Sequence, residues 1–473
     1  MHLADLVTLA PFILLTSGGL TVLMLGVWPQ RVSTRMLTAV TLAFLLLAAA
    51  AALFWELPRE VGSMLVIDGI SRLFTVLCTL GAAAIVLLSY GYAPTRNEAR
   101  KEDIREEYLC LLLFATLGMT LLVSSRHLAS AFIGLEILAV PLYALIAWRP
   151  AREGAVEGGV KYAVLAGFAA AFFLYGIALA YASTGTLDLV ALGTITTGGS
   201  LLPVAMTLML VGIGFKLALV PFHMWAPDIY QAAPTPVTAL FASIAKAAVL
   251  VFLIRLLCLQ LPQIWEALLP LLWGLALISM VAGNLLALRQ QNLKRLLAYS
   301  SIAHLGYILV ALAAGNSLGR DAAIYYAGAY VVMNLGAFSV VAALTHPDHD
   351  RGDIEEYRGL GRRYPALGLA MGVCLLALAG LPPTAGFMAK LLAFGAAVAA
   401  GNIMLAIIAV INTALAFFYY LRIIMVFYGQ QETNRDITPP SKGSIAVAII
   451  ASVLVIGLGI FPQWLLEAYY KAP

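Results

Sequence analysis

The sequence has few charged residues for its length. Charged side chains make up 11% of the 473 residues and hydrophobic residues 62%, whereas a soluble domain carries about 25% charged residues. This composition excludes a soluble globular protein. It indicates that most of the chain lies in a lipid bilayer.

Cysteine is also scarce, and no cysteine has a partner at a useful spacing. The four cysteines each fall in a different apolar segment, at Cys78, Cys110, Cys258 and Cys374. Iron–sulfur and structural zinc sites need clusters such as CxxC, so the sequence predicts neither. Glycine-rich phosphate loops and dinucleotide motifs are absent as well. If the chain serves a redox enzyme, the redox centres are expected in other subunits.

Long apolar runs follow one another along almost the whole chain. Crossing the hydrocarbon takes about 20 mostly apolar residues, and the sequence has room for about 14 such helices. The start, MHLADLVTLAP, lacks the basic region and cleavage site of a secretory signal, so the first helix is expected to be retained. The predicted fold class is an all-α integral membrane protein. The expected spans are 8–28, 37–55, 70–92, 107–124, 127–148, 158–182, 202–221 with a continuation to 232, 236–257, 264–288, 293–314, 321–344, 365–381 continuing over 384–400, 402–428 and 443–466.

Basic residues are unequally distributed between the two sides of these spans. When loops are assigned to alternate sides, 18 of the 28 Lys and Arg residues fall on one side, 6 on the other and 4 inside the spans. The positive-inside rule makes the richer side cytoplasmic. Both termini are therefore expected in the periplasm of a bacterial inner membrane. The net charge of +4 reflects this topology, and no nucleic-acid-binding patch is predicted.

Five ionisable residues lie inside apolar runs: Glu136, Lys161, Lys216, Lys246 and Lys390. A charge at bilayer depth costs at least ~2.5–3.5 kcal/mol, so such residues are candidates for an ion or proton path. Glu136 and Lys216 each precede a proline by five residues, which predicts a comparable depth. A carboxylate that approaches and withdraws would switch Lys216 between holding and releasing a proton.

The remaining buried lysines and His304 are predicted to be relay stations beyond Lys216. Internal water and nearby hydroxyl groups would join them. The candidate hydroxyl groups are those of Ser243, Tyr299, Ser300 and Ser301.

Several of these residues have a structural interpretation that stays open. Glu136 and Lys216 could form a static ion pair. Lys161, a few residues inside its helix, could extend its amine to the membrane surface. His304 could simply hydrogen-bond a carbonyl, and His223 could cap a broken helix.

Two halves of the chain resemble each other at an offset of about 165 residues. Pro221 matches Pro382, and Asp188, expected to be solvated in an external loop, matches Glu355. Each half would hold five helices, so the second must be inverted in the membrane, as in many secondary transporters. The predicted domains are three N-terminal helices (1–104), a first repeat (105–260), a second, inverted repeat (261–430) and a C-terminal helix (431–473).

Proline interrupts one helix in each repeat, around Pro221 in LVPFHMWAPDIYQAAPTPV and at Pro382 and Pro383 in LAGLPPTAGFMAK. Proline has no amide donor, and unpaired backbone at membrane depth needs protein or internal water. Each break is therefore expected to line a hydrated cavity. Lys216 precedes its break and Lys390 follows its own, as inversion predicts.

Four motifs resemble the subunit N family of bacterial NADH:quinone oxidoreductase, respiratory complex I. They are GFKLALVPFHMWAPDIYQAAPTPV, NLKRLLAYSSIAHLGYILVAL, LAGLPPTAGFMAK and FYYLRIIMVFY. The wider family includes the L and M subunits and Mrp-type cation/proton antiporter subunits. Three features favour the N type: PDIYQ after the break, lysine at position 390, and an end soon after the last span.

The resemblance implies a proton-translocating subunit whose path matches six residues of this chain. They are Glu136 and Lys216 as the ion pair of one half-channel, Lys246 as the linking lysine, Lys390 in the second half-channel, and Lys161 and His304 on the central axis. It also implies K- and M-type neighbours in the bilayer. The flavin, iron–sulfur clusters and quinone site would belong to partner subunits, with no cofactor in this chain. The alternatives are a subunit of an Mrp-type antiporter or membrane-bound hydrogenase, and a scaffold that transports nothing.

Overall fold

The computed structural model describes residues 3–27, 32–55, 59–92, 106–150, 154–194, 201–260, 265–345, 352–430 and 439–470. Within these ranges the regular structure is helical except for one antiparallel hairpin, β1 (Arg59–Val61) paired with β2 (Leu65–Ile67). The hairpin is an addition to the predicted all-α fold.

The helices of the first half begin with a short segment and continue as a series of long apolar rods. They are α1 (Leu3–Thr8), α2 (Ala10–Gly26), α3 (Thr34–Leu53), α4 (Gly69–Tyr92), α5 (Glu106–Val123), α6 (Leu128–Ile146), α7 (Ala155–Thr184), α8 (Leu189–Thr194), α9 (Leu201–Leu217), α10 (Trp225–Ala232), α11 (Thr235–Leu240), the π-helical turn η1 (Phe241–Ala245), α12 (Lys246–Ile254) and a second π-helical segment, η2 (Arg255–Gln260).

The second half has the same character. Its helices are α13 (Trp265–Leu288), α14 (Leu293–Leu312), α15 (Ser317–Leu344), the 3₁₀ turn η4 (Ile354–Tyr357), α16 (Leu360–Arg363), α17 (Pro365–Ala379), α18 (Ala385–Ala399), α19 (Ile403–Phe427), α20 (Lys442–Ile460) and α21 (Gln463–Tyr470).

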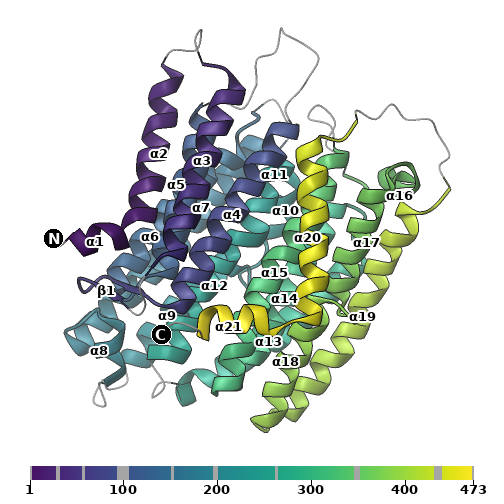
Figure 1. The fold of residues 1–473 in the computed structure, drawn as a ribbon. Helices are drawn as coiled ribbons and strands as arrows, with labels where there is room; N and C mark the ends of the chain where they lie inside the picture. Colours follow the sequence, from purple (N-terminus) through teal and green to yellow (C-terminus); the bar gives the residue numbers. More distant parts are fainter. Residues whose placement is uncertain are drawn as a thin grey trace.

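Eleven helices of the described residues are long and apolar enough to cross a membrane, and four shorter apolar helices accompany them. Every expected span coincides with a helix, or with consecutive helices, to within a few residues. The chain is therefore a multi-pass helical membrane protein. One expected span, 443–466, is not continuous. The chain turns at Phe461 and Pro462, and α21 runs across the end of the bundle at a steep angle to α20 (Figure 1).

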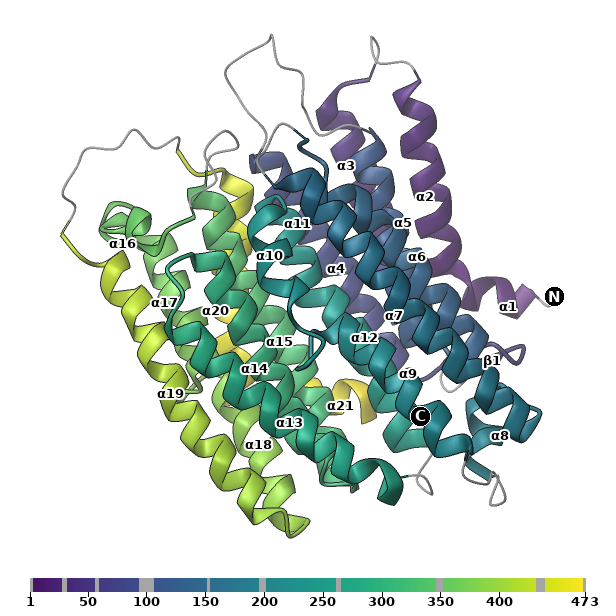
Figure 2. The ribbon, with the colours of Figure 1, turned by 180° about the vertical axis from the view of Figure 1, so that it is seen from behind.

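Three spans form the centre of the bundle. The span Thr235–Leu257 is buried along its whole length, α15 from Ala322 to its end, and α14 along nearly all of it. Neighbouring helices, including α4, α5, α17, α18 and α20, pack around them (Figures 1 and 2). A helix that is apolar on all sides needs such a position. The central helices also carry most of the buried polar residues described below.

Two short backbone bridges recur at one offset in the chain. His127 pairs with Asp188 and Asn292 with Asp353, so both partners are displaced by 165 residues. The sequence pattern matches Asp188 with Glu355, whereas the bridge at this offset has Asp353, two residues earlier. His127 and Asn292 are also the N-cap residues of α6 and α14. After the bridges come α8 and α16, which lie at opposite ends of the bundle (Figure 1).

Helices α9 and α17 end alike, at the two proline-containing breaks. In each, an amide just beyond the helix bonds to the carbonyl five residues earlier, at 2.8 and 3.0 Å. The residue before that amide has left-handed backbone, Ala218 with φ 60° and Gly380 with φ 89°. This is the Schellman arrangement, which satisfies terminal carbonyls and stops the helix. The predicted breaks are thus present, and the chain resumes as α10 and α18.

Candidate functional site

Lys216 lies in the last turn of α9, directly before the first break. It is 9% exposed, and its amine has no hydrogen-bond partner. The centre of the Tyr162 ring lies 5.8 Å from Nζ. A static Glu136–Lys216 ion pair is therefore not formed. The proposed switch between these two residues stays a prediction.

A small cavity is lined by both Lys216 and Lys246. Its volume is about 20 Å³, and a single water needs roughly 10–15 Å³ by the same measure. The cavity is therefore large enough for one water molecule. The cavity is lined by Leu138, Ala139, Leu142, Tyr162, Lys216, Trp225, Phe241, Ala245, Lys246 and Val249.

Lys246 is buried at the point where the π-helical turn η1 gives way to α12. Such turns widen a helix locally and are frequent at functional sites. Its Nζ donates to Ser301 Oγ at 2.5 Å and lies 5.3 Å from the centre of the Tyr230 ring. Ser301 also accepts a hydrogen bond from the Tyr330 hydroxyl at 2.7 Å. Lys246 thus begins a hydrogen-bonded group that reaches α14 and α15.

His304 lies at the centre of a second buried group. Its Nδ1 is 2.9 Å from the Tyr326 hydroxyl and its Nε2 3.2 Å from that of Tyr420. Tyr420 also hydrogen-bonds Ser300. The rings of His304 and Tyr330 have centres 5.8 Å apart. Tyr330 therefore stands between the Lys246 group and the His304 group.

Lys390 lies on α18, and its amine reaches back to the second break. Its Nζ donates to the carbonyls of Leu378 and Ala379, both at 3.0 Å, at the end of α17. These are carbonyls that a terminated helix leaves without partners. The amine is also 5.0 Å from the centre of the Tyr307 ring, which in turn is 5.7 Å from the His304 ring. Lys390 is thus the far member of a row that starts at Lys216.

The structure brings four of the predicted residues into this row: Lys216, Lys246, His304 and Lys390. Of the hydroxyl groups predicted to link them, those of Ser300 and Ser301 take part. Ser243 does not, because it donates to Ala239 of its own helix.

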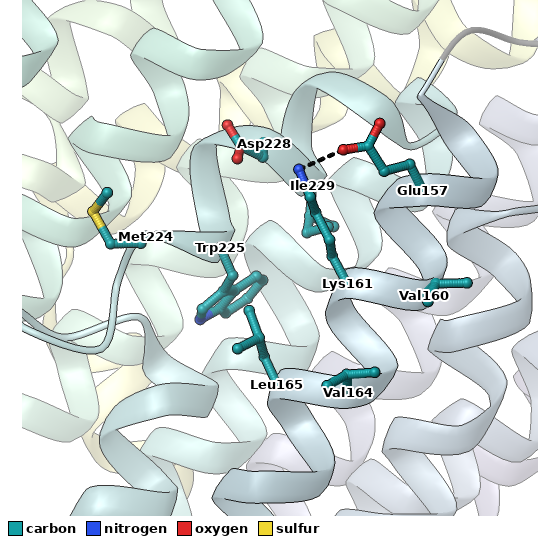
Figure 3. A pocket seen from close by; sticks show the side chains of 9 residues that line it. All are labelled: Glu157, Val160, Lys161, Val164, Leu165, Met224, Trp225, Asp228 and Ile229. Carbon is teal, nitrogen blue, oxygen red and sulfur yellow. Dashed lines mark ion pairs between the residues drawn. The ribbon is translucent and has the colours of Figure 1, made fainter.

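Lys161 and Glu136 lie outside the row. The side chain of Lys161 is 51% exposed and ion-paired with Glu157 at 2.6 Å (Figure 3). The prediction that Lys161 is buried is therefore wrong. Its position on the surface of α7 agrees with the alternative in which its amine reaches the membrane surface. Glu136 is partly exposed on α6, on the face that carries the exposed Ile133 and Val140.

Lys294, at the start of the expected span 293–314, is also a buried cation. It lies in the first turn of α14, and its Nζ donates to the carbonyl of Ala233, at the end of α10, at 2.9 Å. In the sequence Lys294 stands next to Arg295, and two adjacent basic residues usually indicate an exposed position. The sequence does not show that Lys294 packs against the end of α10, and only the structure reveals this contact.

Arg255 is likewise buried. Its guanidinium group binds Asp68 through two hydrogen bonds, at 2.9 and 3.0 Å, and also reaches Ser71 and the carbonyl of Val123. Burial raises the pKa of Asp68, but the charge and hydrogen bonds of Arg255, with those of Ser71, lower it more. The net result is a pKa below the usual value. The pair ties the loop before α4 to η2 and α5.

Asp188 is also paired, contrary to the expectation that it is solvated. Arg126 binds its carboxylate at 3.1 Å and forms a second ion pair with Glu60. These contacts join the hairpin to the segment before α6 and to the start of α8.

The described cysteines do not gather at one place in the chain. Cys78, Cys110 and Cys374 are buried on α4, α5 and α17. Among the described residues, no three His, Cys, Asp or Glu side chains are grouped to hold a metal ion.

The comparison with known families matches residues 125–416 to the transmembrane family of NADH:quinone oxidoreductase and Mrp antiporters. NADH-quinone oxidoreductase subunit N of Trichlorobacter lovleyi is 37% identical, over 99% of this chain and 97% of its own. Subunit N of Chromohalobacter salexigens is 39% identical, over 98% of each chain. The chain belongs to the family of NADH-quinone oxidoreductase subunit N.

Solved structures agree with this family. A chain of respiratory complex I from Thermus thermophilus is 38% identical, with a TM-score of 0.83, over 97% of this chain and 98% of its own. A chain of an archaeal membrane-bound sulfane sulfur reductase is 26% identical, with a TM-score of 0.85, over 99% of this chain and 97% of its own. A chain of the Mrp complex from a Dietzia species is 22% identical, with a TM-score of 0.86, over 100% of this chain and 97% of its own, and shares the fold.

Proposed function

We propose that the chain is a proton-translocating membrane subunit of an NADH:quinone oxidoreductase, and that protons move along the row Lys216, Lys246, His304 and Lys390. The observation that carries the proposal is the water-sized cavity lined by both Lys216 and Lys246. Lys216 lines this cavity, and its amine has no hydrogen-bond partner. Charges are held at membrane depth at considerable cost, which favours a role in ion or proton movement.

The residue types in the row suit proton exchange. A lysine amine accepts and releases protons, whereas an arginine stays charged. Water in the cavity would carry a proton from Lys216 to Lys246, and the hydroxyls of Ser301 and Tyr330 extend the route. A carboxylate about 4 Å from an ammonium stabilises it by ~4 kcal/mol at an effective dielectric near 20. Approach of Glu136 would therefore load Lys216, and withdrawal would release the proton.

We further infer that 105–260 and 261–430 are inverted repeats, flanked by 1–104 and 431–473, in a fold of about 14 spans. The equal offset of the two bridges supports the repeat. Inversion is supported because α8 and α16 follow equivalent bridges but lie at opposite ends of the bundle (Figure 1). Lys216 precedes its break and Lys390 follows its own, so each repeat would supply one half-channel.

The orientation follows from the basic residues. Arg362 and Arg363 lie on α16, at the end of the bundle that the positive-inside rule makes cytoplasmic. We infer from this distribution that both termini lie in the periplasm of a bacterial inner membrane.

We propose that neighbouring membrane subunits of the K and M types cover the exposed face of α6. Glu136 shares that face with Ile133 and Val140. A carboxylate at this depth is unfavourable against lipid tails, so another subunit would cover it. The flavin, the iron–sulfur clusters and the quinone site would lie in partner subunits, and this chain would be a non-redox part of the enzyme.

Substitution Lys216→Ala in the assembled complex tests the proposal. We expect proton pumping in proteoliposomes to be lost and quinone reduction to slow, while NADH oxidation by an artificial acceptor persists. Lys442→Ala, which removes an exposed lysine at the start of α20, is the matched control and should pump normally. Normal quinone reduction with normal pumping by Lys216→Ala contradicts the proposal.

The second candidate is a subunit of an Mrp-type antiporter or of a membrane-bound hydrogenase, with the same row of residues. The fold shared with the Dietzia Mrp complex keeps this candidate open. Purification of a tagged chain separates the two. A flavin- and iron–sulfur-containing NADH oxidase in the purified material supports the first function, and other partners support the second.

A further inference from the structure

A second, larger pocket lies beside the row of lysines, on the outside of the bundle between α7 and α10. Its volume is about 640 Å³ (Figure 3). Its polar lining consists of Glu157 and Lys161, which are paired, and Asp228, which also pairs with Arg295. Glu157 and Lys161 are exposed. The pocket therefore brings proton-exchanging groups to the surface of this chain.

One side chain, that of Trp225, lines both this pocket and the small cavity that Lys216 and Lys246 also line. In Figure 3 the Trp225 ring lies on one side of Lys161, whose amine extends away from the ring toward Glu157. The indole is thus part of the wall between the exposed polar cluster and the buried amines.

The indole is held closed by a small set of contacts. Its N–H donates to the carbonyl of Phe215 at 2.9 Å. Its ring centre lies 4.9 Å from that of Tyr162 and 5.3 Å from that of Phe215. Tyr162 also lines the cavity, so the Trp225 and Tyr162 rings form an apolar contact at the cavity wall. Apolar constrictions of this kind stop ion conduction by excluding water.

The position of Trp225 in the chain lets it move without moving a whole helix. It is the first residue of α10, directly after the non-helical break that follows α9. The hydrogen bond to Phe215 spans this break, from the start of one half-helix to the last turn of the other. A change in the break therefore acts directly on the ring.

We propose that Trp225 is a gate between the Glu157–Lys161–Asp228 pocket and the Lys216–Lys246 cavity, and that protons cross only when the indole leaves its place. This inference rests on the proposed function. With the ring closed, water in the pocket is separated from Lys216, which prevents a continuous leak. With the ring displaced, water joins the two spaces and exchanges protons with Lys216.

The test is the passive proton permeability of proteoliposomes that contain the whole complex, measured as the decay of an imposed pH gradient without NADH. Trp225→Ala should leak about tenfold faster than the unmodified complex, equivalent to a barrier lowered by about 1.4 kcal/mol. Adding Lys216→Ala to Trp225→Ala should suppress that leak. Trp55→Ala is the matched control, because Trp55 is equally buried and also donates its N–H to a carbonyl, that of Thr8, at 2.9 Å.

Equal and slow proton leak rates for Trp225→Ala and Trp55→Ala would overturn the proposal that Trp225 is a gate. If Trp225→Ala does not assemble, Trp225→Phe is compared with Trp55→Phe, and equal leaks again overturn it. Lys216→Ala alone, measured for pumping in the same vesicles, separates the two proposals. Loss of pumping there without a leak in Trp225→Ala leaves the proposed function standing and removes only the gate.

Discussion

At the scale of single residues, the buried cations of this protein differ in how completely their hydrogen bonds are satisfied. Arg255 binds a carboxylate and a carbonyl, Lys390 binds two carbonyls, and Lys294 caps α10. Lys216 has no such partner. A buried polar group without a partner carries a desolvation penalty of about 1–3 kcal/mol, more when it is charged. Function accounts for that penalty better than stability does.

The Arg255–Asp68 pair gives a prediction about stability. Asp68→Asn should destabilise the protein by about 2–3 kcal/mol, somewhat below the range of about 3–5 for a fully buried pair, because the Asp68 side chain is 26% exposed. Thermal unfolding of the purified complex at neutral pH measures the difference.

The effect should depend on pH in a defined direction. The pKa of Asp68 is lowered in the folded protein, so its contribution is complete above the unfolded value of about 3.9 and is lost as pH falls through the folded value. The wild type and Asp68→Asn should therefore converge only below about pH 4. Convergence already near pH 6 contradicts this account.

Sequence predicts the deep lysines well and the peripheral ones poorly. Lys216, Lys246 and Lys390 lie far inside apolar runs, where the side chain cannot extend to the solvent outside the membrane. Lys161 and Lys294 lie near helix ends, where the exposure of a side chain depends on whether another helix packs against that end. Lys161 proved exposed and Lys294 buried.

At the scale of elements, the second break depends on glycine at position 380. Gly380 has φ 89°, and a Cβ there would lie 2.9 Å from Cδ and 3.3 Å from Nζ of Lys390. Gly380→Ala should destabilise the protein by about 1–2 kcal/mol through left-handed backbone strain. It should also push the Lys390 amine from its two carbonyls and slow proton pumping. Thermal unfolding and pumping assays measure both effects.

Gly372→Ala, on the same helix α17, is the control for that substitution. A Cβ there meets no atom within 4 Å. This variant should keep its pumping rate and gain up to about 1 kcal/mol in stability from better helix propensity. Equal behaviour of the two variants would mean that the break does not position Lys390.

Hydropathy predicts the helices because an apolar run in a bilayer has little choice but to be helical. It finds the two breaks through their prolines. It does not find the hairpin β1–β2, the π-helical turn before Lys246 or the turn that separates α20 from α21. Those features depend on contacts between segments that are distant in the sequence, and the local pattern of apolar residues does not predict such contacts.

At the scale of the whole molecule, the orientation predicts which surface positions each side of the membrane can reach. Val190→Cys on α8 and Arg362→Cys on α16 both place a thiol at an exposed position. A membrane-impermeant maleimide should label the first in intact cells and the second only in inside-out vesicles.

The wild-type chain provides the background in this labelling experiment. Its described cysteines Cys78, Cys110 and Cys374 are buried. The reverse pattern would invert the proposed orientation. Labelling of both variants from one side would contradict the inverted relation between the repeats.

The central claim is that Lys216 binds and releases protons during turnover. Lys216→Arg tests it most directly, because arginine keeps the positive charge and much of the size but does not give up its proton. The measurement is the number of protons pumped per electron by the reconstituted complex. We predict that Lys216→Arg assembles and loses proton pumping as Lys216→Ala does. Pumping at the wild-type ratio by Lys216→Arg would contradict the account, because a fixed charge would then suffice at this position.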